Sequence, residues 1–113
     1  MKAIVWYDKH IETAKEFIKT QISRYKIMGI EVQIIESKNF FRFNAENGDL
    51  WQTAPVRESS RGIKCNISYV EKGIPEELIN RIIKPCTTAY PYNAITYYEH
   101  YFEKEEEECQ ITE

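Results

Sequence analysis

The sequence has few glycines, and their spacing builds no nucleotide-binding loop. Loops that cradle phosphates are written GxxxxGK[ST] or GxGxxG, whereas the four glycines of this 113-residue chain are Gly29, Gly48, Gly62 and Gly73. Such a loop supplies the backbone amides and the lysine that hold the β- and γ-phosphates during phosphoryl transfer. A nucleotide hydrolase of this type is therefore excluded.

Residues for nucleophilic catalysis are equally scarce. The two histidines, His10 and His100, lie at opposite ends of the chain, and neither forms a motif with a Ser or Cys and an acid. We expect His10 in the first turn of a helix and His100 at the surface. The sequence predicts no catalytic residue.

Cysteine is also rare. Cys65, Cys86 and Cys109 are an odd number with wide, irregular spacing, which indicates neither a disulfide framework nor a zinc site. No metal and no cofactor are predicted. Free cysteines are typical of a reducing compartment, so we expect a cytoplasmic location.

The chain also has no excess of basic residues and no long apolar run. Fifteen Lys and Arg against eighteen Asp and Glu leave a net charge of −3, which argues against a general nucleic-acid-binding surface. No apolar run approaches the ~20 residues that cross a bilayer. We therefore expect a soluble protein without membrane contact.

The residues that are present favour a packed core. An apolar content of 42% with 13% aromatics is sufficient for one folded domain. We assign this domain to residues 1–102 and interpret residues 103–113 as an acidic, flexible tail.

The segment pattern predicts an α/β fold, with α+β as the alternative. After a strand at 2–7, apolar residues recur every 3.6 positions up to Gly29, with Lys15 on the polar side, so a helix is expected, and Asp8 is its predicted N-cap. Asn47-Gly48 is a strong turn signal and predicts a hairpin over 40–54. The remaining expected elements are strands at 30–36 and 63–70, a helix from Pro75 that Pro85 stops, and a short strand or helix within 95–102.

Connecting the strands at 2–7 and 30–36 through the long helix predicts a βαβ crossover. The expected sheet is small and partly parallel, with the first helix on one face. Two main helices and one hairpin complete this single domain.

The loop between two of the expected strands carries the most unusual polar pattern. Arg57, Ser59, Ser60 and Arg61 lie in RESSRG, and two arginines with two hydroxyls can clamp a phosphate. Alternatively, the segment is a plain polar loop whose arginines pair with glutamates.

Glu71 follows a strand candidate, where open α/β sheets commonly place ligand-binding groups. We include Glu71 among the candidate ligand-binding residues. An equally good interpretation is that Glu71 is a solvated loop residue without a ligand. A metal-dependent hydrolase using Asp49, Glu58 or Glu71 is a weaker hypothesis, since no ligand spacing relates these acids.

Aromatic and acidic residues crowd the C-terminal region. Tyr97, Tyr98 and Tyr101 are too many for so short a segment to bury, which indicates a docking surface. A run of glutamates follows and would face a basic partner. The predicted partner-binding residues are completed by Glu105, Glu106, Glu107 and Glu108.

The order of these segments resembles part of the ATPase domain of phage large terminase subunits, the motors that package DNA. The likeness runs from about residue 2 to 85 and includes the hairpin FFRFNAENGDLWQTAP, the loop RESSRG and the strand CNISYVEK. Two departures stand out: Glu71-Lys72 replaces the paired acids of that family, and the given residues contain no phosphate-binding loop. We also expect no counterpart of the family's nuclease part.

The resemblance implies a motor-like scaffold that does not hydrolyse ATP and whose role is binding. The leading hypothesis is a non-enzymatic, phage-type interaction protein that inhibits or modulates a host or phage nucleic-acid-processing protein, with a homodimer as a further option. The alternative hypothesis is a binder of a nucleotide or other phosphate-containing small molecule through the loop at 57–62.

Overall fold

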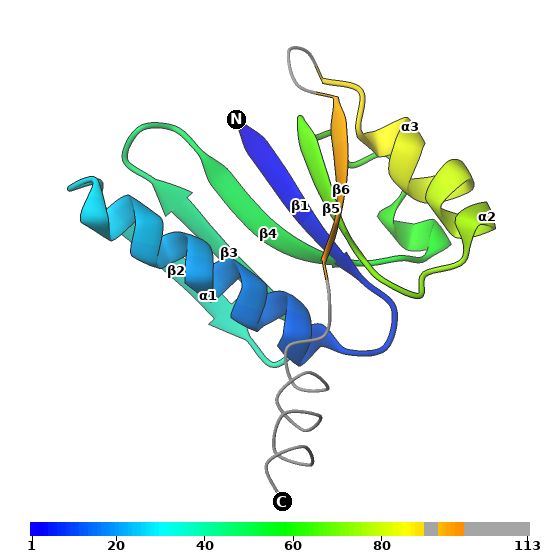
Figure 1. Ribbon diagram of the computed structural model, residues 1–113, viewed down its shortest axis with the longest axis horizontal. Helices are drawn as coiled ribbons and strands as arrows, with labels where there is room; N and C mark the ends of the chain where they lie inside the picture. Colours follow the sequence, from blue (N-terminus) through cyan, green and yellow to red (C-terminus); the bar gives the residue numbers. More distant parts are fainter. Residues whose placement is uncertain (90–92, 99–113) are drawn as a thin grey trace, which may run out of the picture.

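The computed structural model describes residues 1–89 and 93–98. Its centre is one six-stranded mixed sheet in the order β2-β3-β4-β1-β5-β6 (Figure 1). The strands are β1 (Lys2–Tyr7), β2 (Val32–Ser37), β3 (Phe40–Ala45), β4 (Leu50–Pro55), β5 (Ile67–Glu71) and β6 (Ala94–Tyr98). The predicted α/β class and partly parallel sheet are confirmed.

The sheet is parallel on one side and antiparallel on the other. β1 pairs in parallel with both β4 and β5, and β5 pairs in parallel with β6. β2 and β3 are joined antiparallel, as are β3 and β4. The predicted hairpin is therefore β3–β4, and its tight turn has Gly48 at φ +98°, a conformation that glycine adopts at little cost.

The crossover from β1 to β2 differs from the simple unit expected. The helix α1 (Ile11–Ile27) does connect two strands that run in the same direction. However, β3 and β4 lie between β1 and β2, because the β3–β4 hairpin folds back so that β4 pairs with β1. β2 is left at the outer edge.

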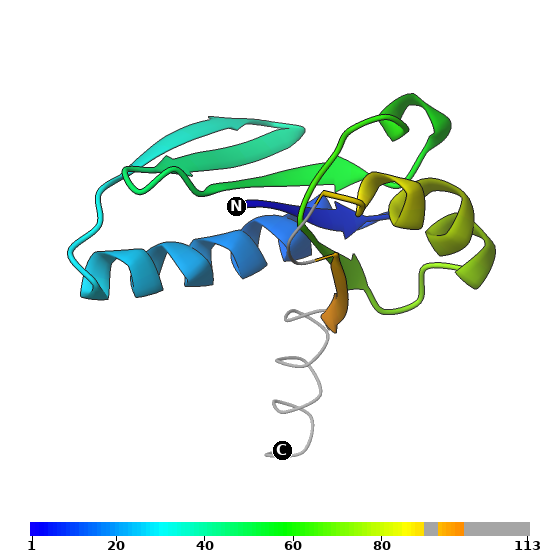
Figure 2. The ribbon, with the colours of Figure 1, turned by 90° about the horizontal axis from the view of Figure 1, so that it is seen from above.

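The first core lies between α1 and one face of the sheet (Figure 2). Alternate residues of the strands point to this face, and their aromatic rings stack: Phe43 on Trp51 with centroids 6.1 Å apart, and Trp51 on Tyr69 at 5.3 Å. Such ring pairs add to the free energy gained by burying their area. The buried members of this core include Ala3, Val5, Tyr7, Ala14, Phe17, Ile18, Ile22, Tyr25, Phe41 and Tyr98.

A second core covers the other face beside β1 and β5. α2 (Glu76–Leu78), a π-helical turn (Ile79–Ile83) and α3 (Lys84–Cys86) form one continuous helical segment against it. A buried polar chain fixes the segment: the Trp6 indole N–H donates to Ser68 at 2.9 Å, and the Ser68 and Thr87 hydroxyls are 2.6 Å apart. Cys65 and Cys86 are buried in this core as free thiols.

Two local expectations were wrong. Pro85 lies inside the last helical turn instead of stopping the helix before it; the wider π turn that precedes it accommodates a ring that a regular α turn would exclude. Asp8 is not the N-cap of α1. His10 occupies that position without a side-chain cap hydrogen bond, since the chain needs two more residues to turn from β1 onto the face of the sheet.

Candidate protein-interaction surface

Most of the exposed large apolar side chains lie on one segment of the chain. Among the described residues, five large apolar side chains are exposed, and four of them belong to the segment that ends α1 and forms β2. They are Ile27 (86% exposed), Met28 (62%), Ile34 (49%) and Ile35 (43%). Single exposed apolar residues are ordinary, but a group on one segment indicates a contact surface.

The edge position of β2 explains this exposure. Within the described residues, β2 pairs on one side alone, with β3 (Figure 1), and α1 contacts β1 and β4 more closely than β2. Ile34 and Ile35 point to opposite faces, yet neither face is fully covered at this edge. We call the outer side of Val32–Ser37 the open edge.

The backbone of the open edge has groups available for pairing. The Glu46 N–H donates to the Glu31 carbonyl at 2.9 Å, so the backbone of Glu31 faces β3. Residues alternate along an antiparallel ladder, so the N–H and C=O groups of Val32, Ile34 and Glu36 point outward. Unpaired groups of this kind template the addition of another strand.

A buried lysine fixes the far end of β2. Lys15 of α1 is 5% exposed, and its Nζ donates to the carbonyls of Ser37 at 2.8 Å and Lys38 at 3.1 Å while lying 3.5 Å from the Glu36 carboxylate. The Lys15 side chain reaches from the helix to the β2–β3 turn and supplies hydrogen bonds to these two carbonyls. The open edge is therefore held in a defined conformation, which reduces the entropy lost on binding.

Two shallow hollows flank the start of β2. One of about 380 Å³ is lined by Lys26, Gly29, Ile30, Glu31 and Val32. The other, of about 390 Å³, lies between β2 and β3 and is lined by Glu31, Val32, Gln33, Asn44, Ala45 and Glu46. Val32, the first residue of β2, lines both hollows.

The loop after β4 does not form the predicted clamp of two arginines. The Arg61 guanidinium lies 3.3 Å from the Glu58 carboxylate, and Arg81 lies 3.0 Å from the same carboxylate. Ser60 is buried, while Ser59 and Arg57 are exposed. The loop is thus tied to the helical segment through Glu58, and the same carboxylate engages Arg61, one of the two predicted clamp arginines.

The carboxyl ends of β1 and β5 form a topological switch point. The connection after β1 passes over one face toward β2, and the connection after β5 passes over the other face toward β6. Open α/β sheets bind ligands at such a point. Glu71, the last residue of β5, lies there and is buried.

Two tyrosines beside this switch point have shifted pKa values. Burial raises the pKa of Tyr7, and the Arg57 cation opposes that shift. Burial also raises the pKa of Tyr98, with further increases from the Glu71 carboxylate and from Tyr7. These four side chains therefore share one electrostatic environment, and both tyrosines stay protonated at neutral pH.

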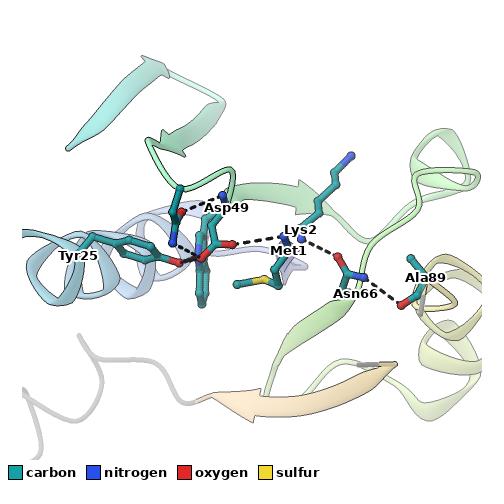
Figure 3. A network of polar contacts seen from close by, with 8 residues as sticks. Met1, Lys2, Tyr25, Asp49, Asn66 and Ala89 are labelled. Carbon is teal, nitrogen blue, oxygen red and sulfur yellow. Dashed lines mark hydrogen bonds and ion pairs between the residues drawn. The ribbon is translucent and has the colours of Figure 1, made fainter. Parts of the chain in front are cut away.

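Asp49, one of the acids of the hydrolase hypothesis, lies just before β4, at the opposite end of the central strands from Glu71 (Figure 3). Its carboxylate accepts from the Tyr25 hydroxyl at 2.6 Å and is 3.3 Å from the Met1 ammonium. Nearby, Asn66 accepts from the Lys2 N–H at 2.7 Å and donates to the Ala89 carbonyl at 3.1 Å. This network joins the amino ends of the parallel strands. Glu58 and Glu71 follow the carboxyl ends of β4 and β5, so the three acids do not form one site.

Of the predicted partner-binding tyrosines, the structure describes two. Tyr97 is exposed at 50%, but Tyr98 is buried at 5%, stacked on Phe17 at 5.0 Å and donating a 2.8 Å hydrogen bond to the Trp6 carbonyl. β6 turns the Tyr98 side chain into the core, so of these two tyrosines Tyr97 is the one that lies at the surface. Tyr101, Glu105, Glu106, Glu107 and Glu108 lie outside the described residues.

The described part of the chain shows neither a metal-ligand cluster nor a membrane-spanning helix. Across positions 1–89 and 93–98, no three or more His, Cys, Asp or Glu side chains are grouped to hold a metal ion. No helix in this part of the chain has the length and apolar character needed to cross a bilayer.

Comparison with known proteins identifies the fold. No protein-family model and no curated protein matches the sequence. Solved structures do match: the large terminase of a thermophilic bacteriophage, in its crystal form 2, aligns with 92% of this chain at a TM-score of 0.55 and 14% identity. The chain has a terminase-like fold.

The terminase likeness extends to further crystals of the same phage protein. Its complex with ADP, in crystal form 3, aligns with 94% of this chain at a TM-score of 0.52 and 16% identity. This chain spans 28% of the first terminase chain and 30% of the second. At such identities the similarity concerns the fold, and it confirms the resemblance drawn from the order of segments.

Proposed function

We propose that this terminase-like chain is an interaction protein that binds another polypeptide by adding a strand to the open edge. The observation that carries the proposal is the combination, on one edge strand, of outward backbone groups with the exposed Ile34 and Ile35. In strand addition the main chain supplies affinity, and alternate side chains supply specificity.

Several features support strand addition over a loose surface contact. Natural edge strands are usually protected by charge, proline or a covering element, whereas the middle of β2 is Gln-Ile-Ile. Lys15 holds the strand in place, and the two hollows lie directly beside its first residues. Because the fold is terminase-like, the first partners to test are nucleic-acid-processing proteins of phage or host, whose activity this chain would modulate.

Lysine-directed cross-linking tests this function. The tagged full chain is cross-linked in a native lysate, and cross-linked lysines are mapped by mass spectrometry. Lys26 and Lys38 flank the open edge, whereas Lys64 and Lys84 lie away from it and serve as internal controls. We expect intermolecular cross-links at Lys26 and Lys38 that disappear in Ile34→Glu; cross-links concentrated at Lys64 and Lys84 would contradict the proposal.

A second candidate function is the binding of a phosphate-containing small molecule at the switch point. It is favoured by the position of Arg57, whose cation acts on Tyr7 at the carboxyl end of β1, and by the ADP complex of the similar terminase. Because Arg61 pairs with Glu58, Arg57 is the residue that would contact the anion; Glu71, at the end of β5, lies at the same end of the sheet.

Thermal unfolding with ADP, ATP and inorganic phosphate tests this second function. A ligand at 100 times its Kd stabilises the folded state by about 2.7 kcal/mol. We expect a shift in Tm that Arg57→Gln abolishes and that the exposed control Lys64→Gln retains. Equal shifts in both variants, or none in the wild type, would exclude binding through Arg57.

A further inference from the structure

We propose that the strand added to the open edge is β2 of a second copy of this chain, paired antiparallel about a two-fold axis at Ile34. The two six-stranded sheets then become one continuous sheet. This inference rests on the proposed function and names its partner.

The backbone of β2 meets the requirements of self-pairing. Val32, Ile34 and Glu36 direct their N–H and C=O groups outward, as the Glu31–Glu46 hydrogen bond establishes. In an antiparallel pair centred on Ile34, Ile34 lies opposite its own copy and Val32 lies opposite Glu36. Each of these pairs joins two residues with outward groups, so both can exchange N–H···O=C bonds.

The side chains of β2 match in the same arrangement. A two-fold axis normal to the sheet keeps the α1 face of both copies on one side, so residues in opposed positions point to the same face. The two Ile34 side chains meet across the axis, and the exposed Ile35 of each copy covers Gln33 of the other. Cross-strand contacts of this kind stabilise a sheet pair by about 0.2–1 kcal/mol each.

Charge complementarity selects this direction and register. Glu31 precedes the strand and Lys38 follows it. Antiparallel pairing about Ile34 sets Glu31 opposite Ser37 and next to Lys38 of the other copy, and symmetry repeats this contact at both ends. A register centred on Glu36 would instead oppose two carboxylates, and like charges directly opposite are destabilising.

Sedimentation equilibrium of the purified full chain tests the proposal. The wild type should show a concentration-dependent dimer. Ile34→Glu places two carboxylates on the axis and should raise the dimer dissociation constant by about tenfold or more. Tyr97→Glu, on the exposed face of the other edge strand, is the matched control and should leave the dimer intact. Because the side chains of Ile34 and Tyr97 are each about half exposed, both variants should retain the wild-type circular dichroism spectrum.

Site-directed disulfides test the register. In a Cys109→Ser background, Ile34→Cys should form an intermolecular disulfide on mild oxidation, because opposed residues of a hydrogen-bonded pair have Cα atoms about 5.5 Å apart. Gln33→Cys faces residue 35 of the other copy and should cross-link far less. A disulfide that forms preferentially in Ile35→Cys would overturn the register centred on Ile34.

The failure of self-pairing is distinguishable from the failure of strand addition. A wild type that stays monomeric at every concentration, or a dimer insensitive to Ile34→Glu, would overturn the second-copy proposal. If that monomer still cross-linked to a different protein at Lys38, strand addition would stand with another occupant.

Discussion

The Tyr25 hydroxyl donates a 2.6 Å hydrogen bond to Asp49, joining the last turns of α1 to the start of β4. Trp51 donates its indole N–H to the same hydroxyl at 3.0 Å, and the Met1 ammonium lies on the other oxygen of the carboxylate. One carboxylate thus connects a helix, the hairpin turn and the chain terminus.

Replacing Asp49 with Asn should destabilise the fold. Hydrogen bonds to charged groups are worth about 1.5–3 kcal/mol, and the variant removes the charge that Tyr25 and Met1 share. We expect a loss of about 1–3 kcal/mol in urea unfolding at pH 7. Asp8→Asn, at an exposed position, is the control and should stay within about 0.5 kcal/mol of the wild type.

The same carboxylate predicts an acid dependence of stability. Burial raises the pKa of Asp49, but hydrogen bonds from Tyr25, the Met1 ammonium and Asn47 outweigh burial and lower it below 3.8. A lowered folded-state pKa contributes stability above pH 3.8 that is lost as pH falls through the folded value. Unfolding free energies measured from pH 6 down to pH 2 should therefore fall less steeply in Asp49→Asn.

Tyr25 predicts that the free energy of unfolding also falls as the pH rises into the alkaline range. Burial, with the hydrogen bond to Asp49, raises its pKa from 10.0 to about 12. The unfolded chain ionises first, so the contribution of Tyr25 is complete below pH 10 and declines as pH rises toward 12. Tyr25→Phe should lose stability at pH 7 yet show a shallower decline between pH 9 and pH 11; an unchanged slope would assign the decline to other tyrosines.

Lys15 should control the order of the open edge. Lys15→Met keeps the length of the side chain but removes the donor to the Ser37 and Lys38 carbonyls. We expect amide hydrogens of β2 and of the β2–β3 turn to exchange faster while those of β1 and β5 keep their protection. Lys26→Met, at an exposed position of the same helix, should leave the exchange pattern unchanged.

Adjacent tyrosines of β6 should respond very differently to truncation. Tyr98 is buried against Phe17, and Tyr98→Ala should cost about 3–5 kcal/mol, as expected for a large buried aromatic. Tyr97→Ala should cost about 0.5 kcal/mol or less because half of that side chain faces solvent. Chemical denaturation of both variants checks the burial assignments directly.

Local patterns predicted most of the elements, because they depend on neighbours in the sequence. The apolar run of β1, the 3.6-residue stripe of α1 and the Asn47-Gly48 turn each specify structure within a few residues. The position of β2 at the sheet edge could not be predicted in this way, since it depends on where the β3–β4 hairpin docks beside β1. The open edge is therefore a property of the tertiary arrangement.

Single side chains were harder to place for the same reason. Lys15 fits the polar side of α1 in the helical pattern, yet the β2–β3 turn folds over it and buries it. Tyr98 follows an exposed tyrosine in an aromatic-rich segment, and strand alternation decides which of the two enters the core. Arg61 could be predicted to bind an anion, but the structure supplies Glu58 as its partner.

The central place of β1 affects how the nascent chain can fold. Ala3 lies beside Trp51 on one side and Ile67 on the other, so β1 waits for partners that are synthesised about 50 and 65 residues after it. Until β5 emerges, Ile4 and Trp6 have no core to enter. Truncated products that end before β5 should therefore aggregate or bind chaperones rather than fold.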